Sequence, residues 1–197
     1  TELGDRLLPA FATPTGIPLG EIDLRSGKTK ATKGSRVATL VEATSIQLEF
    51  RALSRATGNS TYENIAFEVS KLIYHNEDIC NSPPGLCTEY IDTTDASTRS
   101  SNRITFGGPG DSYYEYLLKQ WIQTGKTVPW LVQSYLESVS SMHRYLYRYS
   151  QPNQYAFVGE LRGGQFVPLM VIGCTLELSA SNIWITGDRV ELYLLTN

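Results

Sequence analysis

The residues best suited to chemistry lie in one stretch, where Asp111 and Glu115 stand four positions apart among aromatic side chains. Paired carboxylates hydrolyse glycosidic bonds as acid and base, and sugar rings stack on aromatic faces. The alternative is structural: Asp111 is the expected N-cap of a helix, where it would accept hydrogen bonds from the first turn and meet the positive end of the helix dipole. The aromatic residues of the stretch are Tyr113, Tyr114, Tyr116 and Trp121.

Helices are the elements that must position these groups. Glycines at Gly58 and Gly125 would end two of them, and Pro129 occupies a favoured first-turn position of another. A short turn joins the first two predicted helices, and another joins the last two, which predicts two αα-hairpins of similar length. The spacing between these two hairpins suggests repeated helix pairs, as in an α/α barrel. Apolar residues at three- and four-residue intervals predict the helices over 39–57, 61–75, 111–124 and 129–149.

Shorter elements flank these helices. Residues 1–11 read as the end of a helix, and residues 93–103, rich in serine and threonine, are expected at the surface. A β-hairpin is predicted over 155–170 around a Gly163-Gly164 turn. The tail, 171–197, is strand-like with a turn at 187–188.

Composition describes an ordinary globular protein and excludes some partners. Of the 197 residues, 41% are hydrophobic and 19% charged, with a net charge of −3. This charge gives no electrostatic reason to expect nucleic acid or an anionic membrane surface. Residues 1–5 do not resemble a signal peptide, and no apolar run is long enough to span a bilayer. We therefore expect no nucleic-acid partner, and any membrane anchor would belong to an N-terminal segment absent from this sequence.

Two local features bear on the cellular compartment. Cys80 and Cys87 flank a turn-rich loop. The two cysteines either form a local disulfide that closes this loop or remain free thiols, and both alternatives stay open. A zinc site is not expected, since only His75 lies nearby and no second cysteine pair follows. The triplet Asn59-Ser60-Thr61 is an N-glycosylation sequon at the polar turn between two predicted helices.

Several segments together resemble a known family, the class I α-1,2-mannosidases of glycoside hydrolase family 47. Their order and spacing also match, and the resemblance covers roughly residues 1–170. The segments are Leu3-Gly4-Asp5-Arg6-Leu7-Leu8-Pro9-Ala10-Phe11, Thr13-Pro14-Thr15-Gly16-Ile17-Pro18, Thr44-Ser45-Ile46-Gln47-Leu48-Glu49-Phe50-Arg51, residues 110–125 and Phe157-Val158-Gly159-Glu160-Leu161.

The resemblance implies a mainly α fold: part of an (α/α)7 barrel built of αα-hairpins over residues 1–170, with 171–197 as a divergent tail. It implies an inverting glycosidase of the secretory pathway that removes α-1,2-linked mannose from high-mannose N-glycans in the ER or Golgi lumen. It also implies a calcium ion as cofactor, whose ligand segment is not in this sequence.

Site residues follow from the same resemblance. Asp111 matches the family's catalytic aspartate, a base or acid acting through water, and Glu49 matches a carboxylate that lines the sugar pocket. Glu42 and Glu115 are assigned with Glu49 to substrate binding. The spacing of seven between Glu42 and Glu49 places both on one face of the predicted helix, where ordinary solvent-facing charges would also lie.

The sequence also departs from the family pattern. Pro109 stands where the family has a sugar-binding arginine, and Ala12 stands where the family has an asparagine. The resemblance does not continue after Met170. The family's upstream acid, downstream glutamate and calcium-binding threonine match no segment here. Inverting hydrolysis needs two carboxylates about 6.5–9.5 Å apart. A non-catalytic glycan-binding module of ER quality control and an inactive fragment are therefore the alternatives.

Overall fold

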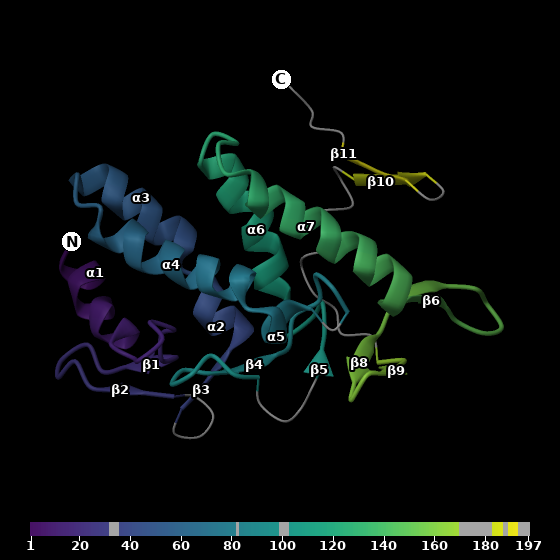
Figure 1. Cartoon of the computed structure of the whole chain (residues 1–197), viewed down its shortest axis with the longest axis horizontal. Coiled ribbons are helices and arrows are strands. Elements are labelled where there is room, and N and C mark those ends of the chain that lie inside the picture. Colours follow the sequence, from purple (N-terminus) through teal and green to yellow (C-terminus); the bar gives the residue numbers. More distant parts are fainter. Residues whose placement is uncertain (32–35, 82, 99–102, 170–182, 187–188, 193–197) are drawn as a thin grey trace.

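Two antiparallel helix pairs form the body of the computed structural model (Figure 1). The structure describes residues 1–31, 36–81, 83–98 and 103–169, and the backbone of 183–186 and 189–192. Both predicted αα-hairpins are confirmed. The first pair is α3 (Gln47–Thr57) with α4 (Thr61–His75), and the second is α6 (Asp111–Gln123) with α7 (Pro129–Ser141).

The predicted helix over 39–57 is wrong in one respect, because it is two helices. Helix α2 (Leu40–Thr44) ends at Thr44, with Ser45 as its C-cap residue, and α3 begins at Gln47. The side chain of Gln47 bridges the break: its Oε1 accepts from the Ile46 N–H at 3.0 Å, and its Nε2 donates to the Ala43 carbonyl at 3.1 Å. The Gln47 side chain therefore satisfies backbone groups that lose their helical hydrogen bonds at the break. The spacing of apolar residues does not reveal such a side-chain interaction.

The helix predicted to reach residue 149 is shorter than expected. Helix α7 ends at Ser141, a wider π-type turn, η2 (Met142–Leu146), follows, and the chain then becomes strand β6 (Tyr147–Tyr149). Strand β6 pairs antiparallel with β7 (Ala156–Val158). The apolar periodicity continues past the helix because Met142 and Leu146 are still buried.

The predicted β-hairpin over 155–170 is confirmed in part. Strands β8 (Glu160–Arg162) and β9 (Gln165–Val167) pair across the Gly163-Gly164 turn, and β8 also pairs with β5 (Arg103–Ile104). Residues 156–158 belong instead to the β6–β7 pair.

Short elements complete the fold, and the strands β1 to β5 lie along one edge of the helical body (Figure 1). The chain starts with helix α1 and a 3-10 turn η1, which confirms the predicted helix over 1–11. The described part contains no helix long and apolar enough to cross a bilayer. These elements are α1 (Glu2–Leu7), η1 (Leu8–Phe11), β1 (Glu21–Ile22) paired with β2 (Thr29–Lys30), β3 (Val37–Thr39) paired with β4 (Tyr90–Asp92), and α5 (Glu77–Cys80).

The strand-like tail is described over two segments. Strands β10 (Ile183–Thr186) and β11 (Arg189–Leu192) pair antiparallel. The predicted turn at 187–188 lies outside the described residues, as do residues 170–182 and 193–197.

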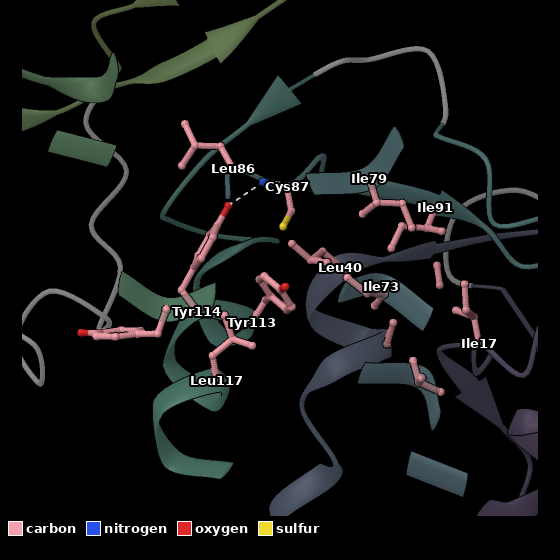
Figure 2. Close-up of a cluster of buried hydrophobic side chains, with 14 of the residues drawn as sticks. Ile17, Leu40, Ile73, Ile79, Leu86, Cys87, Ile91, Tyr113, Tyr114 and Leu117 are labelled. Carbon is pink, nitrogen blue, oxygen red and sulfur yellow. Dashed lines mark hydrogen bonds between the residues drawn. The ribbon is translucent and has the colours of Figure 1, made fainter. Parts of the chain in front are cut away.

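A single cluster of buried side chains joins the helix pairs to the strand edge. The cluster includes Ala96 of the 93–103 segment, at 6% exposed, and Thr93 is also buried, at 3% exposed, so the expectation that this segment is all surface is wrong. Figure 2 shows side chains of this core, among them Ile17, Leu40, Ile73, Ile79, Leu86, Cys87, Ile91, Tyr113, Tyr114 and Leu117.

Candidate active site at the start of helix α6

The turn that leads into α6 is tightly packed. Gly110 is the N-cap residue, and a Cβ there would lie 2.4 Å from the carbonyl oxygen of Thr105. No side chain fits at that position without a backbone shift, so glycine is required by close approach. Asp111 is consequently the first residue of the helix and makes no capping bond, which corrects its expected N-cap role.

The Asp111 carboxylate is half-buried at the positive end of α6, where the helix dipole favours negative charge. Its Oδ1 accepts from the Ser112 N–H at 2.7 Å and from the Ser112 hydroxyl at 3.3 Å. Within the described residues these are its hydrogen bonds, and no cation pairs with it. The predicted catalytic residue therefore keeps an oxygen available for water or a ligand.

Glu49 and Glu115 come together around Tyr116. The Tyr116 hydroxyl donates to Glu49 Oε1 at 3.0 Å, which joins α6 to α3. Burial first, then this hydrogen bond and the charges of Glu49 and Glu115, raises the pKa of Tyr116 to about 12. Glu115 lies on the same face of α6 as Asp111, one turn on, and forms an ion pair with Lys119. Glu49, which is exposed, is therefore linked to α6 through Tyr116, and Asp111 and Glu115 lie one turn apart on that helix.

Glu42 has a different environment. It belongs to a capping box: its N–H donates to Thr39 Oγ1 at 3.2 Å, and its Oε2 accepts from the Thr39 N–H at 2.9 Å. The break after α2 also removes the helix face that Glu42 was expected to share with Glu49. Glu42 borders a cavity of about 300 Å3 against η1, whose lining includes none of the other three predicted site residues.

Two of the aromatic residues expected to stack against a sugar are core residues instead. Tyr113 is 4% exposed and Tyr114 is fully buried, stacked on Phe106 with ring centroids 3.8 Å apart. Tyr116 and Trp121 remain half-buried. Helical geometry explains the burial of Tyr113, which lies on the side of α6 opposite Asp111 and Glu115, whereas Tyr114 is buried by its stacking on Phe106.

The Cys80–Cys87 disulfide forms, which decides between the two alternatives left open by the sequence. The Cys87 N–H donates to the Tyr114 hydroxyl at 3.0 Å (Figure 2). The Tyr113 hydroxyl lies 3.8 Å from Cys80 Sγ. The disulfide loop therefore packs on the buried side of α6 and supports the helix from behind the candidate site.

A buried ion-pair cluster of Glu89, Arg103 and Glu160 was not predicted. Arg103 donates to both oxygens of the fully buried Glu160, at 2.6 and 3.0 Å, and to Glu89 at 3.2 Å. Arg162 adds a further contact to Glu160 at 3.1 Å. The one sequence signal was that Glu160 falls in the Phe-Val-Gly-Glu-Leu segment.

The cluster reaches the start of α6 through Thr105. Burial would raise the pKa of Glu160, but the hydrogen bonds and charge of Arg103, then hydrogen bonds from Arg162 and Thr105, hold this pKa below its ordinary value. Thr105 Oγ1 accepts from the Gly107 N–H at 3.0 Å, and its carbonyl oxygen faces Gly110. The cluster is therefore a positioning element for the turn that presents Asp111.

Among the described residues, no three Asp, Glu, His or Cys side chains gather closely enough to hold an ion. The described part therefore does not by itself fit the calcium ion that the family resemblance implies.

Comparison with known proteins decides the family. The model of glycosyl hydrolase family 47 matches residues 1–177. The chain belongs to this family. It is 39% identical over 165 residues to the human endoplasmic reticulum mannosyl-oligosaccharide 1,2-alpha-mannosidase, covering 84% of this chain and 23% of that protein. The enzyme of the same name from Saccharomyces cerevisiae is 37% identical, with 83% of this chain and 30% of that protein covered.

A solved structure shows the same fold. The alpha-1,2-mannosidase from Trichoderma reesei superposes with a TM-score of 0.75 at 23% identity, covering 84% of this chain and 34% of that chain. The predicted family and the mainly α architecture of paired helices are thereby confirmed. This family 47 chain spans 23% to 30% of the length of the human and yeast relatives.

Proposed function

We propose that this chain is the part of a family 47 α-1,2-mannosidase that carries its Asp111 carboxylate. The proposed reaction is hydrolysis of terminal α-1,2-linked mannose from high-mannose N-glycans with inversion. The observation that carries the proposal is the placement of Asp111: half-buried at the positive end of α6, free of any cation in the described residues, and one turn from Glu115.

In this proposal Asp111 acts through a water molecule. An inverting glycosidase uses one carboxyl group to protonate the leaving oxygen and another to activate water, with about 6.5–9.5 Å between them. Asp111 takes one of these roles. The second catalytic carboxyl group and the calcium ligands would come from segments of the protein outside these 197 residues.

Glu49, Glu115 and Tyr116 are proposed to bind the sugar. Carboxylate oxygens accept hydrogen bonds from sugar hydroxyls, and the Tyr116 hydroxyl holds Glu49 in place at 3.0 Å. Glu42, whose carboxylate is engaged in the capping box, contributes by shaping the α2 side of the site. The start of α6 lies against α2, because the Val41 N–H donates to the Pro109 carbonyl at 3.2 Å.

The proposed location is the lumen of the secretory pathway. Two observations support it: the Cys80–Cys87 disulfide, which is typical of oxidising compartments, and the similarity to the human and yeast relatives, which are named as endoplasmic reticulum enzymes.

The test is made on the complete protein that contains this sequence, with a Man9-type oligosaccharide as substrate and free mannose as the readout. Asp111→Asn should lower kcat by about 10²–10⁴-fold, the usual contribution of a general acid or base. Glu68→Gln, at an exposed position of α4, is the matched control and should hydrolyse at the parental rate. Undiminished hydrolysis by Asp111→Asn would overturn the proposed role.

A second candidate function is glycan binding without hydrolysis. It is favoured by Pro109, which offers no side-chain donor two residues before Asp111. The same experiment separates the two: a protein that binds the oligosaccharide, releases no mannose and keeps its affinity in Asp111→Asn is a binding protein.

A further inference from the structure

The turn between α3 and α4 carries a feature that the proposed activity does not use. The sequon Asn59-Ser60-Thr61 lies there, and every residue from 55 to 61 is exposed. Gly58 has a φ of +73°, and a Cβ built on it meets no atom within 4 Å. The surroundings of the turn are therefore open enough to hold a large group attached to a side chain.

The local hydrogen bonds leave the Asn59 amide nitrogen able to carry a substituent. Its Oδ1 accepts from the Thr61 N–H at 3.0 Å, and its main-chain N–H donates to Thr57 Oγ1 at 3.2 Å. The side-chain amide also contacts the Tyr62 hydroxyl. A primary amide has two N–H groups, so replacing one leaves the other for this contact.

The turn is remote from the candidate site. Arg55 Nη2 donates to the carbonyl of Gln123 at 2.9 Å, so the end of α3 lies beside the last residue of α6. Asp111 is the first of the 13 residues of that helix, which puts it about 20 Å from the α3–α4 turn along the helix axis. A bulky group at Asn59 therefore stays clear of the start of α6.

We propose that Asn59 is an N-glycosylation site. Its amide nitrogen would form a bond to the anomeric carbon of an oligosaccharide carried on a polyprenyl diphosphate. The bond between that carbon and the diphosphate oxygen breaks, the lipid diphosphate leaves, and the amide proton passes to solvent. The inference rests on the secretory location proposed above, but not on mannosidase activity.

The test directs the chain into the secretory pathway of cultured cells behind a cleavable leader. The wild-type chain should migrate as a larger species that peptide N-glycosidase converts to the unmodified size. Mass spectrometry should then find aspartate at position 59 in place of asparagine. The shift should be lost in Asn59→Gln and in Thr61→Ala, but kept in Ser60→Ala, since the middle position of the sequon accepts any residue except proline.

A positive control keeps the result decisive. Leu24→Asn creates a sequon with Ser26 in another exposed turn, where Leu24 is 43% exposed. If the Leu24→Asn, Asn59→Gln double variant is modified while the wild-type chain is not, the proposal is wrong. This outcome does not depend on hydrolysis, so failure of the proposed activity would be seen separately.

Discussion

At the scale of single residues, the four carboxylates of the candidate site differ in the partners that they bind within the protein. Glu42 caps its own helix, Glu115 pairs with Lys119, and Glu49 holds the Tyr116 hydroxyl. Asp111 bonds with Ser112 alone among the described residues. Residue types and spacing pointed to Asp111 and Glu115, and the family resemblance added Glu42 and Glu49. Which partner each carboxylate has depends on contacts between residues distant in the sequence, such as the 67 positions between Glu49 and Tyr116.

Tyr116→Phe tests the contact between α3 and α6. The hydroxyl that orients Glu49 is lost, so KM for the oligosaccharide should rise several-fold while kcat changes little. The free energy of unfolding should fall by only about 1 kcal/mol, the net value of one hydrogen bond. Steady-state kinetics on the complete protein provide the measurement, and Tyr155→Phe, at a position 70% exposed, is the control. A fall in kcat with KM unchanged would contradict the assignment of Glu49 to substrate binding.

At the scale of elements, turns decide where the site groups point. Periodicity predicted α4, α6 and the start of α7 well, because their apolar residues face one core. It could not predict the break between α2 and α3, which a glutamine side chain stabilises, or the change from helix to strand after Met142. The sequence also predicted Asp111 as the N-cap of α6, whereas the N-cap is Gly110. The nearby Thr105 carbonyl leaves no room for a side chain at residue 110.

Gly110→Ala tests that close approach. The added Cβ would lie 2.4 Å from the Thr105 oxygen, so the turn must move and the free energy of unfolding should fall by about 1–3 kcal/mol. Activity should fall with it, since Asp111 is the next residue. Denaturant unfolding gives the first quantity. Gly27→Ala, at an open position with a φ of +70°, should cost stability through backbone strain alone and leave activity unchanged. Equal activity loss in both variants would show that the approach at Gly110 is unimportant.

At the scale of the whole molecule, the buried cluster of Glu89, Arg103 and Glu160 ties the strand edge to the helices. Arg103 holds the pKa of Glu160 below its ordinary value despite burial. Since the folded-state pKa is the lower one, this stabilisation is complete above the unfolded value, about 4.3, and is lost as the pH falls through the folded value. Apart from the place of Glu160 in the Phe-Val-Gly-Glu-Leu segment, nothing in the sequence showed that these residues would be buried together.

Glu160→Gln should therefore destabilise the protein by about 3–5 kcal/mol near neutral pH, the usual cost of breaking a buried ion pair. Its stability should also depend less on pH below about 4.5, because the group that titrates in that range is gone. Thermal unfolding followed from pH 7 to pH 3 measures both effects. Glu68→Gln, which removes only the exposed ion pair with Lys71, should show the same dependence of stability on pH as the parental protein. A parental acid profile in Glu160→Gln would mean that other carboxylates govern acid unfolding.

The Arg103–Glu160 contact also has a practical consequence for the choice of expression boundaries. The two residues are 57 positions apart, and strand β9 pairs with the strand that contains Glu160. A shortened chain that stops after helix α7 would retain the candidate carboxylates yet leave the Arg103 guanidinium without its principal counter-ion. Recombinant pieces designed for crystallisation or for binding studies should accordingly extend through Val167.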